Sequence, residues 1–319
     1  MKLEQYETAE EKKSHFKDYQ IVRTTKEFDD MCKNTEALER KNLQKYLFRG
    51  LNSARYKLYT SAQRLWIERD VSSIGLTFNE YILNLIKSFN NDSCILNRYF
   101  RRLGIIKNDW LILSYLQHHG ASTPLLDFTK QFKTALFFSL DDIKGTPGTE
   151  LDNYVSIYYY KAVDVANKVS KSIYKLAKDK AKTLNWDKDG KLWKDLSFSN
   201  VTKNHKTILV PTYASKSNIK NSKHQLVSIY TVANLNSTAQ EGEFVCNCDD
   251  NTPLEDIWNI NNERYLSCID IHKGLVDYIL NKYLKIESLA AAKLKYYPNE
   301  HNLAMQIQRD ALSQQRTIK

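Results

Sequence analysis

The stretch YVSIYYYKA, residues 154–162, decides the fold class, because its β-branched and aromatic residues are typical of a buried strand. Four later stretches have a similar composition and the length of a buried strand: KTILVPTY (206–213), HQLVSIYTVA (224–233), GEFVCN (242–247) and YLSCIDIH (265–272). The stretch KYLFRG, 45–50, predicts one earlier short strand that ends at Gly50. Strands therefore dominate the second half of the chain.

The first half carries apolar residues at helical spacing instead. Four helices are predicted over TSAQRLWIERD (60–70), TFNEYILNLIKSFNNDSCILNRYF (77–100), NDWLILSYLQHHG (108–120) and KQFKTALFFSL (130–140). Thr60 and Thr77 are expected N-caps, Asn108 or Asp109 begins the third helix, and Gly120 ends it. Helices first and strands later predict an α+β fold, in which a helical N-terminal half packs on a mixed or antiparallel sheet.

The two ends of the chain differ from this middle part. Residues 1–40 are polar and rich in Lys and Glu, which predicts an N-terminal helical extension. Residues 41–310 are expected to form the main α+β domain, with a basic insertion near 164–206, and residues 311–319 a short tail. The last fifty residues return to a helical pattern that Pro298 interrupts.

Charge and cysteine content limit the class of protein. The formal net charge of +10 favours acidic partners such as nucleic acid. The sequence has neither a signal peptide nor an apolar run approaching roughly 18 residues, which predicts a cytoplasmic protein without membrane contact. Of the five cysteines only Cys246 and Cys248 lie close together, so we expect reduced, mostly buried thiols and no disulfide framework or zinc site.

Residues 168–206 hold most of the excess positive charge. They contain eleven Lys against four Asp, a net charge of +7. These lysines could follow a phosphate backbone while Trp186, Trp193 and Phe198 stack on bases. Alternatively the stretch is an ordinary solvated helix and loop whose aromatic side chains dock it on the core.

The stretch KYLFRGLNS, residues 45–53, places Arg49 between Phe48 and Gly50. An arginine before a glycine at a strand end can present its guanidinium to a phosphate or carboxylate, since glycine lets a ligand approach the backbone. A surface arginine beside a turn would have the same pattern.

Residues 115–138, YLQHHGASTPLLDFTKQFKTALFF, carry polar groups among apolar neighbours: Gln117, His118, His119, Thr123, Asp127 and Thr129. Such groups cost about 1 to 3 kcal/mol each when unpaired, so they either brace one another or serve a ligand. Asp127 follows two leucines and precedes an aromatic residue, so we expect it to be largely buried and paired, with a bracing role. The two histidines have no metal-ligand spacing and are expected to be structural, so no metal is predicted.

The stretch STAQEGEFVCN, residues 237–247, brings Gln240, Glu241 and Glu243 into a strand through Gly242. Two glutamates two residues apart on a strand share a face. They could form a solvated edge or a pair that holds a ribose.

Together these stretches resemble the FRG domain, a family named for its (F/Y)RG motif. LFRG (47–50), QHHGASTPLLDFT (117–129) with ALFFS (135–139), and AQEGEF (239–244) occur in the family's order, and YYPNEHNLAMQI (296–307) resembles its closing segment. The resemblance covers roughly residues 40–310 and implies an FRG-type domain over 41–310. If the blocks build one site, a single concave pocket should be lined by Arg49, Gln117, Thr123, Asp127 and Gln240.

A second resemblance, to ADP-ribosyltransferases of the arginine class, suggests a chemistry. These enzymes begin with an aromatic residue, Arg and Gly at a strand end, and close with Glu-x-Glu or Gln-x-Glu before an apolar strand. The resemblance implies that Arg49 holds the phosphates or ribose of NAD, Glu243 stabilises the ribose cation, and Glu241 orients the acceptor. It further implies NAD contacts from Phe48, Gly50, Gln117 and Thr123, a third catalytic residue in Gln240, and support from His118, Asp127 and Thr129.

Two classes of function follow. The first is an NAD-dependent ADP-ribosyltransferase, a glycosyltransferase that uses NAD as substrate and modifies RNA, DNA or protein. The family resemblance suggests a toxin-like effector in antiphage defence, with an antitoxin or chaperone as protein partner. The alternative is a non-catalytic nucleic-acid-binding FRG module. A hydrolase has no nucleophile motif to support it.

Overall fold

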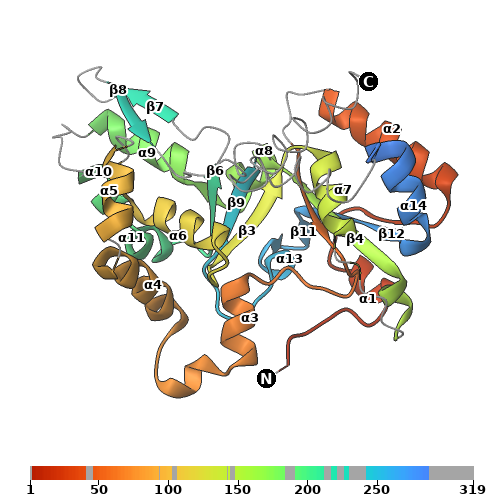
Figure 1. Ribbon diagram of the computed structural model, residues 1–319, viewed down its shortest axis with the longest axis horizontal. Helices are drawn as coiled ribbons and strands as arrows, with labels where there is room; N and C mark the ends of the chain where they lie inside the picture. Colours follow the sequence, from red (N-terminus) through yellow and green to blue (C-terminus); the bar gives the residue numbers. More distant parts are fainter. Residues whose placement is uncertain are drawn as a thin grey trace, which may run out of the picture.

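The computed structural model describes residues 2–40, 46–92, 94–102, 106–141, 143, 148–183, 191–211, 217–220, 226–229 and 242–286. Its centre is a sheet of eight strands in the order β1-β12-β4-β2-β3-β9-β6-β5 (Figure 1). These strands are β1 (Tyr19–Val22), β2 (Tyr46–Leu51), β3 (Leu125–Thr129), β4 (Tyr154–Lys161), β5 (Lys171–Ser172), β6 (Thr207–Pro211), β9 (Gly242–Asn247) and β12 (Leu266–His272). The pairs β1–β12 and β5–β6 are parallel and the others antiparallel, so the predicted α+β fold with a mixed sheet is confirmed.

Two short antiparallel ribbons lie outside this sheet. One pairs β7 (Ser217–Lys220) with β8 (Leu226–Ile229), and the other pairs β10 (Asn259–Ile260) with β11 (Glu263–Arg264). The predicted strand at 224–233 therefore supplies β8 to a separate hairpin, and its residues 224, 225 and 230–233 lie outside the described part. Strand β2 continues to Leu51, one residue past the expected end at Gly50.

Helices, joined by loops and turns, surround the strands in the described chain. They are α1 (Ala9–Lys13), α2 (Thr25–Arg40), α3 (Ser61–Glu68), α4 (Phe78–Asp92), α5 (Cys94–Arg102), α6 (Asp109–His118), α7 (Phe132–Leu140), α8 (Ala162–Lys168), α9 (Ile173–Thr183), α10 (Lys191–Asp195), α11 (Phe198–Thr202), α13 (Leu254–Ile257) and α14 (Val276–Tyr278). Short 3₁₀ turns are η1 (Val71–Ile74), η2 (Glu150–Asn153) and η3 (Lys273–Leu275), and η4 (Ile279–Leu284) is a π-helix.

Capping residues set the helix starts that the sequence predicts. Thr60 and Gln63 form a capping box at the start of α3, and the Asn108 side chain accepts a hydrogen bond from the Leu111 N–H at the start of α6. Gly120, with φ +83°, follows the end of α6 as expected. These local signals act within one turn, which is why the sequence alone reveals them.

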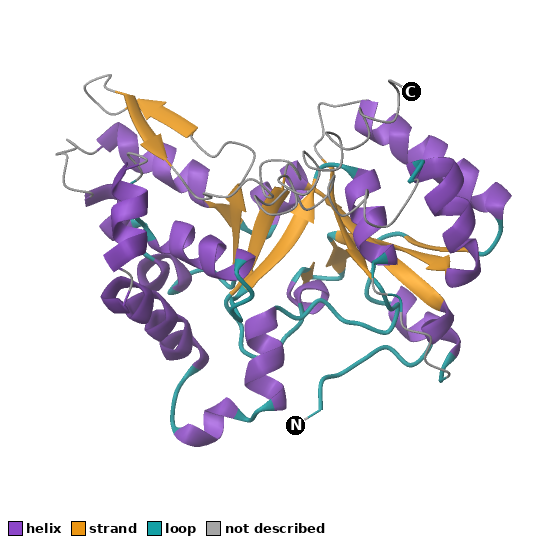
Figure 2. Ribbon diagram, in the orientation of Figure 1, coloured by secondary structure: helices purple, strands orange, loops and turns teal. Residues whose placement is uncertain are grey.

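Side chains that alternate along β3 and β9 point into different hydrophobic clusters of the core. Leu125 and Phe244 pack in one hydrophobic cluster with residues of α4, α6 and α9, whereas Leu126, Phe128 and Val245 point into another cluster. A third cluster joins Phe48 of β2 to α7. Figure 2 shows these helices on either side of the central strands.

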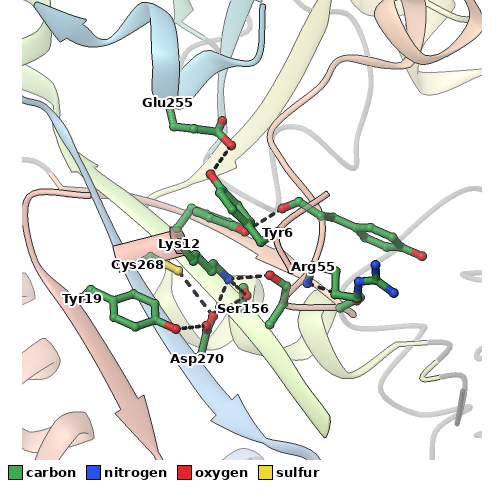
Figure 3. Close-up of polar contacts among 12 residues, drawn as sticks. Tyr6, Lys12, Tyr19, Arg55, Ser156, Glu255, Cys268 and Asp270 are labelled. Carbon is green, nitrogen blue, oxygen red and sulfur yellow. Dashed lines mark hydrogen bonds and ion pairs between the residues drawn. The ribbon is translucent and has the colours of Figure 1, made fainter. Parts of the chain in front are cut away.

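The N-terminal residues are more than the helical extension that the sequence predicts. Residues 19–22 form β1, which pairs with β12 from the other end of the chain. Lys12 is fully buried, and its Nζ donates to Asp270 Oδ1 at 2.7 Å, Ser156 Oγ at 2.7 Å and the Ala54 carbonyl at 2.8 Å (Figure 3). A buried, fully hydrogen-bonded ammonium makes this segment part of the core.

The basic stretch 168–206 runs from the end of α8 through β5, α9, α10 and α11. Trp193 and Phe198 are buried in the core, and the Phe198 ring lies 5.8 Å from that of Trp110. Of the two alternatives, docking on the core is therefore the one that holds for Trp193 and Phe198, because packing uses their faces; Trp186 lies outside the described residues. Among the residues of the stretch that the structure describes, nine lysines are exposed: Lys168, Lys171, Lys175, Lys178, Lys180, Lys182, Lys194, Lys203 and Lys206.

Two further sequence expectations concern cysteines and membranes. Cys32, Cys246 and Cys268 are buried and Cys248 is half-buried, and all four carry free thiols. Within the described ranges, every helix is too short or too polar to span a lipid bilayer. Pro298 and the tail 311–319 lie outside the described residues.

Candidate functional site

The site lies where β2 and β3 part. Strand β2 pairs with β4 over its full length, but the register joins it to β3 through the single pair Phe48–Thr129. Figure 2 shows the strands on the β3 side leaning away from those on the β4 side. Arg49 is the next residue of β2, so its side chain begins at the point of separation.

Arg49 closes the junction between the two strands. Its Nη1 donates to the backbone carbonyl of Asp127 at 2.8 Å and lies 3.7 Å from Asp127 Oδ2. The Arg49 side chain is 16% exposed, and among the described residues its buried Nε has no hydrogen-bond partner. The junction therefore holds a cation whose Nε–H can still donate a hydrogen bond to a ligand.

The surroundings of Arg49 disfavour its charge. Burial lowers the pKa of Arg49, Asp127 opposes that shift, and the positive charge of nearby Arg64 on α3 adds to it. Arginine nevertheless stays protonated in proteins. A bound anion would relieve the unfavourable electrostatics of two neighbouring guanidinium groups.

The polar residues of 115–138 brace one another. Gln117 Nε2 donates to Asp127 Oδ2 at 2.9 Å, and the Thr123 hydroxyl donates to Gln117 Oε1. The Thr123 backbone is tied to α3 by hydrogen bonds with Ser61 Oγ and Ala62 N, both 3.0 Å. The chain of contacts links α3, α6 and β3 and presents Asp127 to Arg49.

The expectation that Asp127 is largely buried is wrong, because its side chain is 48% exposed. Alternation along β3 sends Leu126 and Phe128 into the core and Asp127 to the opposite face. There the half-buried Gln117, near the end of α6, supplies a partner without covering the carboxylate. Asp127 is nevertheless paired, by a hydrogen bond from Gln117 and a contact with Arg49.

The two histidines lie at the end of α6. His118 is its last residue and His119 its C-cap, with ring centroids 5.0 Å apart. Burial lowers the pKa of His118, and His119 adds to the shift while Asp127 opposes it. Over the described part of the chain, three or more His, Cys, Asp or Glu side chains are nowhere arranged to hold a metal ion.

Phe48 and Gly50 serve packing. Phe48 is buried, with its ring 5.6 Å from that of Phe132 on α7. A Cβ at Gly50 would lie 1.9 Å from the Ala135 carbonyl oxygen. The glycine therefore admits the backbone of α7, which corrects the interpretation that it admits a ligand.

Glu243 belongs to β9, which lies two strands away from the β2 strand of Arg49. The register runs Phe48–Thr129–Gly242 across β2, β3 and β9, and β2 and β9 point the same way because both are antiparallel to β3. Arg49 and Glu243 each follow that row by one residue; Phe128 pairs with Glu243, whereas β2 and β3 no longer pair at Arg49. Glu243 is 5% exposed.

The structure thus unites Arg49, Gln117, Thr123 and Asp127, with Thr129 buried beside them in β3. Gln240 and Glu241 lie outside the described residues, so their place in a shared pocket stays a prediction. Sequence reasoning missed Ser61 and Arg64, because on an amphipathic helix they have no signal beyond ordinary surface polarity.

Comparison with known proteins identifies part of the chain. Residues 44–146 match the family model of the FRG domain. The match includes LFRG and the 115–138 stretch, so this resemblance is confirmed there; residues 237–247 lie outside it. No curated protein and no solved structure matches the chain.

Proposed function

Because the chain carries an FRG domain at residues 44–146, with Arg49 in its signature motif, we propose that it binds NAD through Arg49 and transfers ADP-ribose. The observation that carries the proposal is the Arg49 guanidinium, held by the Asp127 carbonyl with a buried Nε–H unpartnered among the described residues. A phosphate oxygen would satisfy that donor and the charge together.

Arg64 supports an anionic ligand. Its charge lowers the pKa of Arg49, and its side chain belongs to an exposed residue of α3. Two neighbouring cations suit the pyrophosphate of a dinucleotide better than a single carboxylate. The hydrogen-bonded chain from Thr123 through Gln117 to Asp127 keeps Arg49 in place for this contact.

Glu243 would supply the chemistry of transfer. The bond between ribose C1′ and the nicotinamide nitrogen breaks, and its electron pair leaves with nicotinamide. A carboxylate near the developing ribose cation lowers the barrier because it is already oriented. An acceptor nucleophile then bonds to C1′ and loses its proton to a base. The place of Glu243 one residue past the row Phe48–Thr129–Gly242, on the same side of that row as Arg49, favours this role.

The acceptor in this proposal is RNA, DNA or protein, and the exposed lysines of 168–206 favour nucleic acid. In the cell the activity would be that of a toxin-like effector in antiphage defence, held in check by an antitoxin or chaperone. Expression of the wild type should then arrest the growth of a bacterial host, whereas expression of Glu243→Gln should not.

A second candidate is a non-catalytic nucleic-acid-binding module. The hydrogen bonds among Gln117, Thr123 and Asp127 favour it, because groups that satisfy one another need no ligand. In this case Arg49 would contact a nucleic acid phosphate, and NAD would not bind.

Labelled NAD incubated with the protein and total RNA, DNA or lysate tests the transfer, and calorimetry with unlabelled NAD tests binding. We expect label in one macromolecular fraction. Arg64→Ala should weaken NAD binding, while Arg69→Ala, an exposed arginine just after the same helix, should not. NAD binding without label transfer would favour a sensor, and the absence of both would favour the nucleic-acid module.

A further inference from the structure

A pocket separate from the Arg49 junction lies at the end of β2 opposite to Gly50. It has a volume of about 630 Å³ and is formed where β2 begins, β4 ends and β12 begins. Four tyrosines line it: Tyr46, Tyr159, Tyr160 and Tyr265. Tyr46, Tyr159 and Tyr265 are half-buried and offer faces on which a planar ligand can stack, whereas Tyr160 is buried and packs against Phe128 and Trp258 in the core.

The aromatic wall is preformed. The rings of Tyr46 and Tyr159 lie 6.3 Å apart at an interplanar angle of 54°, and Phe48 packs 5.8 Å behind Tyr159. Burial raises the pKa of Tyr159 to about 12, so its hydroxyl stays protonated near neutral pH. Tyr46 and Tyr159 are both half-buried and open to the pocket.

The charged residues of the wall give it a small positive excess, with four cations against three carboxylates: Lys17, Lys161, Lys168 and Arg264 against Asp18, Asp164 and Glu263. Each carboxylate has a partner within the wall. Glu263 is bound by Lys168 at 3.1 Å and by Tyr265, Asp164 lies 3.7 Å from Lys161, and Asp18 accepts from Ser267 at 3.1 Å.

The rim carries the cations best placed for a ligand. Lys17 and Arg264 are exposed, and Arg264 Nη1 makes one long contact, 3.5 Å, with the Phe16 carbonyl. Lysine and arginine at the mouth of an aromatic pocket match a ligand that has a planar base and a phosphate. Glu263 and Asp164 are paired with Lys168 and Lys161, which offsets their charges, and a base carries no charge that Asp18 could repel.

We propose that this tyrosine pocket, lined by Tyr46, Tyr159, Tyr160 and Tyr265, binds one nucleotide of a single-stranded nucleic acid. This proposal rests on the part of the proposed function that names nucleic acid as the partner, and it assigns that nucleic acid a binding site. Tyr46 precedes Arg49 by three residues on the same strand, so the two lie about 10 Å apart. The side chains of Tyr46 and Arg49 leave opposite faces of the strand because three residues separate them, and Arg49 does not line the pocket.

Fluorescence anisotropy with labelled eight-nucleotide RNA and DNA, in the absence of NAD, tests the pocket. Tyr46→Leu removes one stacking face and should weaken binding about tenfold, as should Lys17→Ala combined with Arg264→Ala. Two matched controls should bind like the wild type: Tyr56→Leu, an exposed tyrosine outside the pocket, and Lys87→Ala, an exposed lysine on α4.

Circular dichroism should show unchanged folding for every variant. If Tyr46→Leu binds as well as the wild type while removal of the α9 lysines abolishes binding, the basic surface is the site and the pocket proposal is overturned. Displacement of the oligonucleotide by NAD would also overturn it, since the pocket would then belong to the dinucleotide. Because NAD is absent from the main assay, failure of ADP-ribose transfer leaves this result unaffected.

Discussion

Arg49 Nη1 lies 2.8 Å from the backbone carbonyl oxygen of Asp127 and 3.7 Å from its carboxylate. The closer contact is with the main chain, which every residue at position 127 would keep. The junction between β2 and β3 thus depends on the arginine more than on the aspartate.

Asp127→Ala should therefore lower the free energy of unfolding by about 1 kcal/mol or less, because a half-exposed ion pair is screened by water. Arg49→Met should cost about 1 to 3 kcal/mol, since it removes the hydrogen bond to the Asp127 carbonyl. Urea denaturation of both variants measures the difference. A loss of about 3 kcal/mol for Asp127→Ala would mean that the carboxylate holds the junction.

Glu243→Gln keeps the shape of the side chain and removes its charge. Under the proposed transfer reaction, the rate should fall by about two to three orders of magnitude while NAD affinity is kept, because the charge acts on the developing cation. Arg49→Ala should instead weaken NAD binding itself, since a phosphate contact acts in the ground state. Single-turnover transfer and calorimetry separate the two effects. Wild-type transfer by Glu243→Gln would exclude this glutamate from the chemistry.

Gly50→Ala should destabilise the fold by about 3 kcal/mol, through overpacking rather than ligand loss. The new Cβ would lie 1.9 Å from the Ala135 carbonyl oxygen and 2.6 Å from the Ser139 nitrogen, and both atoms belong to the backbone of α7. Gly148→Ala is the matched control, because its nearest neighbour, 2.2 Å away, is the movable carboxylate of Asp152. Thermal unfolding should show a much larger loss for Gly50→Ala; equal losses would contradict the backbone clash.

Lys12→Met should cost about 3 to 5 kcal/mol, because it leaves the Asp270 carboxylate buried without its cation. The double variant Lys12→Met with Asp270→Leu should recover much of this loss, since no uncompensated charge remains. Chemical denaturation of the two single variants and the double variant gives the coupling energy. Strictly additive losses would show that the pair has no direct interaction.

His15 gives the N-terminal segment a pH-dependent contact. Its Nδ1 lies 2.6 Å from Asp256 Oδ1, and this hydrogen bond raises the pKa of His15 above its ordinary 6.5. Nearby Glu255 adds to the shift, whereas burial and Lys57 oppose it. A raised folded-state pKa contributes stability that is complete below roughly pH 6.5 and is lost as pH rises through the raised value.

The stability difference between wild type and His15→Asn should accordingly shrink as pH rises above roughly 6.5. Urea denaturation of both proteins at several pH values measures this difference. Because other histidines such as His118 are present in both proteins, their contributions cancel when the two unfolding free energies are subtracted. A difference that grows with pH would mean that His15 is bound in its neutral form.

Local chemistry let the sequence determine much of the fold. Capping by Thr60 and Asn108 and the β-branched run at 154–161 act within a few residues, so helices α3 and α6 and strand β4 were predictable. The LFRG motif and the 115–138 stretch likewise identified an FRG domain that the family match confirms over 44–146. Strand β1, by contrast, lies in a polar segment whose pairing partner is more than 240 residues away.

Only the tertiary structure decided what the site residues do. The Arg49 contact with Asp127 spans 78 positions and the Lys12 contact with Asp270 spans 258, so no local pattern encodes either. The exposure of Asp127 depends on where α6 ends above β3, and the need for Gly50 depends on how closely α7 approaches β2. Such features arise from packing between distant elements, where distances of a few ångströms set which polar groups are paired and which stay open to a ligand.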